Sequence, residues 1–176
     1  MEAVGAGQFH VTSVRALPLP RAAGTSRVVT RGPAVEVTTR GRRAPALAAR
    51  LRRGGRRLLS ALRLETAELS VLLVSDGEMR RLNRTYRGKD RSTDVLAFAQ
   101  RDGDGGAPDG LLGDVVISVD TAKRQAAERG ASLARESERL LIHGVLHLIG
   151  YDHERSAMEA RRMQRRERLL ARRLAS

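Results

Sequence analysis

The chain is organised around the stretch LLIHGVLHLIGYDH, which spans residues 140–153 and holds three of the protein's four histidines. His143 and His147 are four residues apart, so on a helix their side chains project from one face, one turn apart. Gly150 can end that helix because glycine adopts a left-handed conformation without steric cost. The chain can then turn back and bring His153 towards the other two rings. The stretch therefore predicts a helix and a turn that gather three imidazoles.

Three neutral imidazoles that converge and leave a fourth position open are the ligand set of a catalytic zinc site. A single histidine in so apolar a helix would ordinarily be a hydrogen-bonded core residue, and a pair at this spacing could arise by coincidence. A third histidine after an intervening glycine makes coincidence a poor explanation. We therefore expect one Zn²⁺ per chain, held by His143, His147 and His153.

The spacing of the three histidines is also similar to the metzincin pattern H-E-x-x-H-x-x-G-x-x-H. In those proteases the glutamate of the pattern is the general base. Gly144 occupies its position in this chain. A zinc peptidase would thus have its ligands but lack its base, which indicates different chemistry at a similar metal.

The composition is that of one soluble globular domain. The chain has 176 residues, of which 41% are hydrophobic and 30% charged, and no apolar run approaches the roughly 18 residues that span a membrane. There is no cysteine, so disulfides and thiolate metal ligands are excluded. A transition-metal site must then be built from histidines and carboxylates, and the composition is compatible with a reducing cytosol.

The net charge of +13 and the pI near 11.5 favour a polyanionic partner such as nucleic acid. Of the 33 basic residues only Lys89 and Lys123 are lysine, which leaves 31 arginines. A GC-rich coding bias would have the same effect, so the charge supports a nucleic-acid partner without establishing one. Aromatic residues make up only 2% of the chain, so a base-stacking surface is not expected.

Residues 1–33 are rich in Gly, Pro and Ala and show no sustained periodicity, which predicts a flexible N-terminal extension. An organelle transit peptide and a start codon assigned too early are alternative interpretations. A single domain is expected at residues 34–174.

Periodicity within this domain predicts an α+β fold, with a sheet of about four strands, helices packed on it and a zincin-like central metal-binding helix. A glycine-rich loop is expected at residues 102–110. The last helix should carry Ala160, Met163, Leu170 and Leu174 on one face and eight arginines elsewhere between Arg155 and Arg173. The expected strands are residues 35–39, 68–74, 93–98 and 113–119, and the expected helices are residues 45–63, 76–86, 121–129, 133–149 and 156–174.

Four segments, in this order and spacing, resemble the YbeY family of bacterial endoribonucleases. They are LNRTYRGKD at residues 82–90, STDVLAF at residues 92–98, LGDVVIS at residues 112–118 and the histidine motif at residues 143–153. The resemblance covers residues from about 35 to 170. It implies a cytoplasmic, single-strand-directed, metal-dependent endoribonuclease in 16S rRNA 3′-end maturation and ribosome quality control. The implied partners are single-stranded RNA or rRNA and the ribosome or small-subunit proteins, without a membrane.

In this family the motif histidines hold zinc, and an arginine of the Tyr-Arg-Gly-Lys-Asp segment is essential. These roles fall on His143, His147 and His153, and on Arg87. The chain departs from the family at Ala97 and Ala99, where serine and proline are usual. Neither change removes a metal ligand.

The planar guanidinium of Arg87 can grip two phosphoryl oxygens as negative charge grows on them. Since Gly144 cannot act as a base, the acidic candidates near the motifs are Asp114, Asp120, Asp152 and Glu154. Asp152 could equally orient a histidine ring.

The basic segments from Arg40 to Arg57 and from Arg155 to Arg173 could follow an RNA backbone without reading its sequence, or could be solvated helix faces. A ribosome-associated assembly factor with a structural zinc remains an alternative to the nuclease, and a zinc peptidase is a less favoured one.

Overall fold

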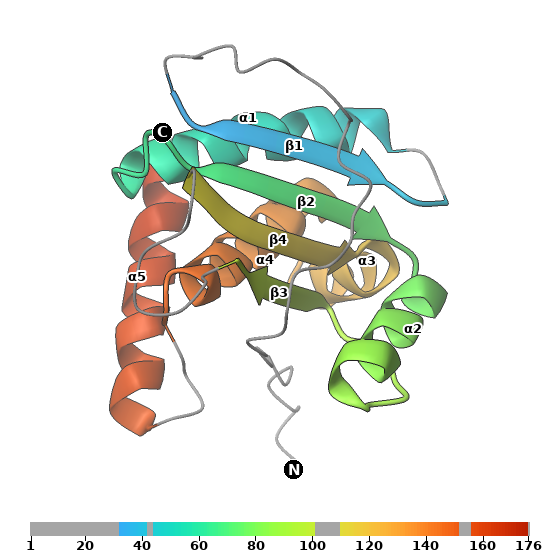
Figure 1. Ribbon diagram of the computed structural model, residues 1–176. Helices are drawn as coiled ribbons and strands as arrows, with labels where there is room; N and C mark the ends of the chain where they lie inside the picture. The colour runs from blue at the N-terminus through green and yellow to red at the C-terminus, as the bar shows by residue number, and fades with distance from the viewer. Residues whose placement is uncertain (1–31, 42–43, 101–109, 152–155, 176) are drawn as a thin grey trace.

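A computed structural model describes residues 32–41, 44–100, 110–151 and 156–175 of the chain (Figure 1). Strands and helices alternate through most of it. In chain order the elements are β1 (Ala34–Thr39), α1 (Pro45–Ala61), β2 (Glu68–Val74), α2 (Asp76–Arg87), β3 (Val95–Ala99), β4 (Leu111–Ser118), α3 (Val119–Glu128), α4 (Leu133–Leu148) and α5 (Ala157–Ala175).

The four strands form one mixed sheet in the order β1-β2-β4-β3. β1, β2 and β4 run parallel, and β3 is antiparallel to β4. The last strand in sequence is therefore an interior strand in space. The α+β prediction with about four strands is confirmed.

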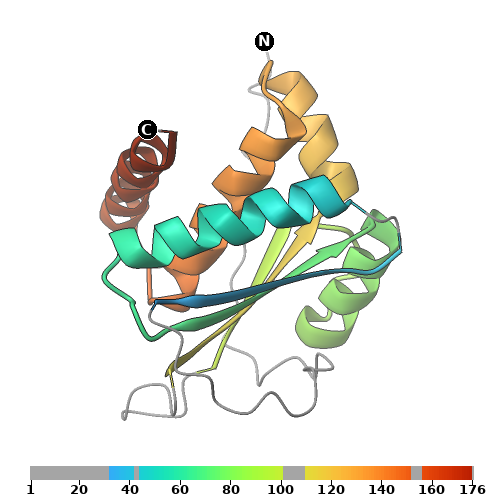
Figure 2. The ribbon, with the colours of Figure 1, turned by 90° about the horizontal axis from the view of Figure 1, so that it is seen from above.

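Helices cover the two faces of the sheet unequally. Val35, Val71 and Val115 point to one face, where they pack with residues of α1, α4 and α5 in the larger hydrophobic core. Leu72 and Val116 point to the other face, which α2 covers in a second, smaller core. Figure 2 shows α1 and α4 on one side of the sheet and α2 on the other. Groups carried by α2 and by α4 are thus separated by the thickness of the sheet.

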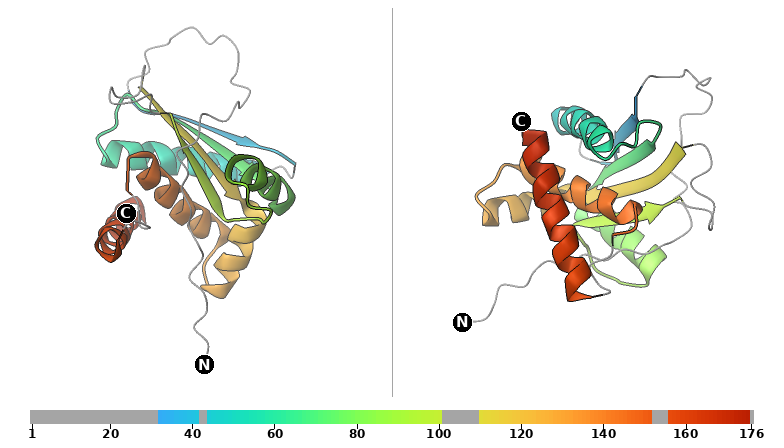
Figure 3. Two further views of the ribbon diagram at one scale, coloured as in Figure 1. Left: turned by 60° about the horizontal axis from the view of Figure 1, so that its bottom comes forward. Right: turned by 90° about the vertical axis from the view of Figure 1, so that its left-hand side faces the viewer.

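The helix predicted to be central is α4. Every residue from Leu140 to Leu148 is buried, as its nearly uninterrupted apolar sequence predicts. α5 packs across α4 and also reaches α1, so α4 lies between the sheet and the C-terminal helix (Figure 3). This position shields the histidine-bearing part of α4 on both sides.

The first predicted helix is continuous through Gly54 and Gly55. A Cβ on Gly55 would lie only 3.0 Å from Val35 Cγ1, so the glycine lets α1 approach β1. One strand boundary needs correction. The fourth strand ends one residue earlier than predicted, at Ser118, and α3 follows at once. Ser118 is the N-cap of α3, and its hydroxyl accepts a hydrogen bond from the backbone N–H of Thr121 at 3.3 Å.

The predicted N-terminal extension, apart from Gly32 and Pro33, lies outside the described residues, as does most of the predicted loop at 102–110. Within the described parts of the chain, no helix is long and apolar enough to cross a membrane.

Candidate metal centre

The paired histidines lie on one face of α4, as their spacing predicts. The Nε2 atoms of His143 and His147 are 2.9 Å apart, and the two rings meet edge to face with centroids 4.5 Å apart. The residues are 3% and 5% exposed, so both are screened from bulk water. Two imidazole nitrogens thereby meet in a buried setting.

The turn after α4 also follows the prediction. Gly150 has a φ of +94°. Its N–H donates to the carbonyl of His147 at 2.9 Å, and the N–H of Tyr151 donates to the carbonyl of Leu146 at 3.0 Å. These two bonds form a Schellman motif, which ends the helix and reverses the chain. The third predicted ligand, His153, lies outside the described residues, and within them no group of three metal-ligating side chains comes together.

A carboxylate from α5 contacts the first histidine. Oε1 of Glu167 lies 2.5 Å from Nδ1 of His143. This contact joins a residue of the C-terminal helix to the buried pair on α4, and it was not predicted from the sequence.

The two histidines fit a zinc ion in both donor type and spacing. Nitrogens that share a tetrahedral zinc at about 2.0–2.1 Å stand roughly 3.3–3.4 Å apart, so the pair at 2.9 Å needs only a small separation to accept the ion. Without a metal, the same approach is a hydrogen bond from one N–H to one ring lone pair. The donor set is one that zinc prefers.

Gly144 faces the sheet. A Cβ at this position would lie 2.8 Å from Val115 Cγ1 and 3.4 Å from Val95 Cγ2. Real Cβ atoms do not approach so closely, so the glycine is what lets α4 pack against β4 and β3. A glutamate there, as in metzincins, would run into the sheet. The close packing of α4 on the sheet therefore excludes the glutamate base that a metzincin peptidase has at this position.

Arg87 is the last residue of α2, half-buried, with its Nη1 atom enclosed. Gly88 ends the helix with a φ of +66°. The buried Asn83 holds the following turn, because its Nδ2 donates to the carbonyl of Arg91 at 2.7 Å. This turn leads into β3, the strand on whose other side α4 packs. β3 therefore links the arginine-bearing segment to the histidine-bearing helix.

Polar side chains of the other two matching segments meet at Asp76, the first residue of α2. Its Oδ1 accepts hydrogen bonds from the hydroxyls of Ser118 at 2.5 Å, Thr121 at 2.7 Å and Ser92 at 3.0 Å. Its Oδ2 lies 2.8 Å from Nη1 of Arg124. Partial burial acts to raise the pKa of Asp76, but these hydrogen bonds outweigh it and lower the pKa to about 2. Ser92 and Ser118 thus have a structural partner in this fold.

Comparison with known proteins identifies the family of the chain. A family model described as Endoribonuclease YbeY matches residues 46–175. The chain belongs to the endoribonuclease YbeY family.

Relatives of the same name come from several bacteria. An endoribonuclease YbeY from Geobacter metallireducens is 49% identical over 136 residues, which cover 76% of this chain and 91% of the relative. One from Anaeromyxobacter sp. is 53% identical over 71% of this chain and 64% of its own length. One from Aquifex aeolicus is 52% identical over 62% of this chain and 71% of its own length.

The fold agrees with a solved structure. The solution structure of TM1509 from Thermotoga maritima has a TM-score of 0.59 and 25% identity, and the match covers 80% of this chain and 88% of that one. The predicted YbeY resemblance is confirmed, and so is the main interpretation of the chain as an endoribonuclease, a nuclease of the hydrolase class. The assembly-factor and peptidase alternatives are not favoured.

Of the four acidic residues considered as a general base, two have partners elsewhere in the fold and two lie outside the described residues. Asp114 is on the sheet face that α2 covers and accepts a hydrogen bond from Nε2 of Gln100 at 3.2 Å. Asp120 accepts from the first N–H of α2 at 2.9 Å. Asp152 and Glu154 lie outside the described residues. None of the four is assigned as a general base.

Glu167 is the site residue that sequence reasoning missed, although a signal for it exists. The apolar face predicted for the last helix includes Met163 and Leu170, and position 167 falls between them at helical spacing. A carboxylate in the middle of an inward-facing stripe must find a buried partner. His143 is that partner.

Proposed function

We propose that this protein is a zinc-dependent endoribonuclease that cuts single-stranded RNA in 16S rRNA 3′-end maturation and ribosome quality control. Its place of action is the cytoplasm, and its partners are the ribosome or small-subunit proteins. Family membership supports the cutting of RNA. The observation that supports the metal is the 2.9 Å approach of the His143 and His147 Nε2 atoms in a buried setting.

The zinc would be held by His143, His147 and His153. When bound, zinc supplies Lewis acidity, which polarises a phosphoryl oxygen and lowers the pKa of water to about 7. The protein's own contribution is to hold the Nε2 atoms of His143 and His147 close together in a buried setting. The Schellman turn at Gly150 ends α4 three residues before His153 in the sequence.

Arg87 would meet the charge that develops on the phosphoryl group. Its guanidinium can donate two parallel hydrogen bonds to phosphate oxygens. The turn behind it is fixed by Asn83, so the arginine would be held ready before substrate arrives. β3 follows the turn after α2 and packs against α4. This connection supports the proposal that one RNA strand contacts both that turn and α4.

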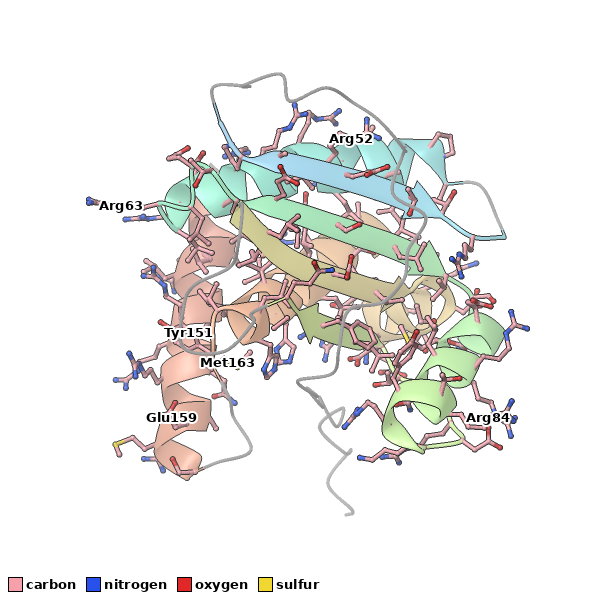
Figure 4. All side chains as sticks on the ribbon, viewed as in Figure 1. Arg52, Arg63, Arg84, Tyr151, Glu159 and Met163 are labelled. Carbon is pink, nitrogen blue, oxygen red and sulfur yellow. The ribbon has the colours of Figure 1, made fainter. Side chains whose placement is uncertain are left out.

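Two basic segments that are far apart in sequence join into one surface on α1 and α5. Nη2 of Arg57 donates to the carbonyl of Arg173 at 3.3 Å, which places the two helices side by side. Arg52 and Arg63 point away from the body of the protein (Figure 4). We define the α1–α5 basic surface as the exposed arginines of these helices apart from Arg50, which pairs with Glu138: Arg52, Arg53, Arg56, Arg57, Arg161, Arg162, Arg165, Arg168, Arg172 and Arg173.

This surface would hold RNA through its phosphates. Contacts of this kind carry no sequence information, so they suit an enzyme whose cleavage position is chosen by other features of its substrate or by a partner. The scarcity of aromatic residues agrees with binding through the backbone in place of base stacking.

Metal analysis combined with RNA cleavage tests the proposal. Zinc content and cleavage of a 16S rRNA 3′ fragment are measured for the wild type and for His143→Ala, His147→Ala and His153→Ala. His10→Ala, at the fourth histidine of the chain, is the matched control. We expect one zinc per chain and full cleavage in the wild type and the control, and loss of both in the three motif variants. Stoichiometric zinc in all three would overturn the site.

A further inference from the structure

The contact between Glu167 and His143 crosses from α5 to α4 and is largely enclosed. The side chain of His143 is 4% exposed and that of Glu167 is 20% exposed. The two atoms that meet are Oε1 of the carboxylate and Nδ1 of the ring, 2.5 Å apart. The other ring nitrogen of His143, Nε2, is the one directed at His147.

This arrangement determines which nitrogen of His143 carries a proton. A carboxylate only accepts hydrogen bonds, so Nδ1 must be the protonated nitrogen that donates to Glu167. In the neutral ring Nε2 then carries a lone pair in place of a proton. That lone pair is the group a metal ion requires, and it lies on the side of the ring that faces His147.

We infer that Glu167 is a positioning residue for the metal: it fixes the tautomer and the orientation of His143, so that Nε2 is presented as a ligand. The inference rests on the metal site of the proposed function. It gives α5 a role in the chemistry of the site in addition to its role in covering α4.

A purely structural role, in which the carboxylate only docks α5 on α4, is the competing explanation. Met163 and Leu170 flank Glu167 by four and three residues, and both are buried in the larger hydrophobic core. They dock the helix by apolar contact on either side of the carboxylate. The carboxylate interrupts this apolar stripe at the one place where it meets a predicted ligand, which favours positioning over docking.

Three full-length proteins separate the two explanations: the wild type, Glu167→Gln and Glu159→Gln. Glutamine has nearly the same shape as glutamate, but its amide can donate to Nδ1 and so permit the tautomer with the proton on Nε2. Glu159 lies two turns earlier on the same helix (Figure 4), and its substitution removes the same charge from α5. Zn²⁺ affinity is measured by competition with a chromogenic chelator, and metal-free samples give the unfolding temperature and the His143 tautomer by long-range ¹H–¹⁵N NMR.

We expect Glu167→Gln to bind Zn²⁺ about 10- to 100-fold more weakly than the wild type and to shift His143 towards the Nε2–H tautomer. Glu159→Gln should match the wild type in both measurements. A docking role alone would lower the unfolding temperature of the metal-free protein and leave the tautomer and the affinity unchanged.

Equal Zn²⁺ affinity in Glu167→Gln and the wild type overturns the inference, whatever happens to the unfolding temperature. Weakened affinity in Glu167→Gln together with a wild type that binds Zn²⁺ but cuts no RNA would leave the inference standing and refute the proposed function. A wild type that takes up no Zn²⁺ overturns both.

Discussion

The hydrogen bonds that converge on Asp76 make a measurable contribution to stability that depends on pH. Asp76→Asn keeps the shape of the side chain and removes its charge, so the hydroxyl donors of Ser118 and Thr121 face a neutral amide. Because the folded state lowers the pKa of Asp76, the carboxylate stabilises the fold at pH values above its ordinary pKa of 3.8. That contribution disappears as the pH falls through the folded-state value of about 2.

The magnitude follows from the two pKa values. A decrease from 3.8 to about 2 corresponds to about 2.4 kcal/mol, at 1.36 kcal/mol for each pH unit. The Asp76 side chain is 30% exposed, and its charged partner Arg124 is 58% exposed, so solvent screens part of this effect. We therefore expect Asp76→Asn to lower the free energy of unfolding at pH 7 by about 1–2 kcal/mol.

Urea unfolding of the wild type and Asp76→Asn at several pH values between 2 and 7 measures the difference. The difference between the two proteins should be constant from pH 7 to about pH 5 and should shrink as the pH approaches 2. A difference that is the same at pH 2.5 and pH 7 would refute the reasoning, because it would mean that the ionised carboxylate is not what the donors stabilise.

Two further predictions concern α4 and α5. Gly144→Ala should destabilise the protein by about 1–2 kcal/mol in urea unfolding, because overpacking against Val115 at 2.8 Å outweighs the better helix propensity of alanine; unchanged or raised stability would contradict the close packing. Replacing Arg165 and Arg168 by serine should weaken RNA binding and reduce the slope of log affinity against log salt by about 0.7 for each phosphate that the protein no longer neutralises. Arg135→Ser, on α4, is the matched control and should leave that slope unchanged, whereas an unchanged slope in the double variant would remove α5 from the binding surface.

The helices and strands could be predicted closely because the hydrophobic periodicity and the positions of capping and turn residues agree along the chain. The strand at 68–74 and the α2 helix have clear patterns, and Ser75 caps α2 by accepting from the N–H of Glu78 at 3.3 Å, as a sequence of this kind predicts. The end of α4 was predictable too, since Gly150 is the residue that a left-handed C-terminal position requires.

What the sequence could not supply is the partner of each polar group across the fold. Glu167 and His143 are 24 residues apart, and only the packing of α5 on α4 brings them together. Asp76 likewise collects hydroxyl donors from segments up to 45 residues away. The direction of Gly144 also depends on how α4 rotates against the sheet, so its contact with β4 follows only from the three-dimensional arrangement.

The strand order has a consequence for how the protein is made. β4 lies between β2 and β3, so β3 has no neighbouring strand, and β2 has only β1, until residues 111–118 have been synthesised. The helix that carries His143 comes later still, and Glu167 belongs to the last helix of the chain. The nascent chain therefore cannot bring the carboxylate of Glu167 to His143 until residue 167 has been synthesised. A chain with this topology thus lacks its assembled candidate metal centre until α5 has been synthesised.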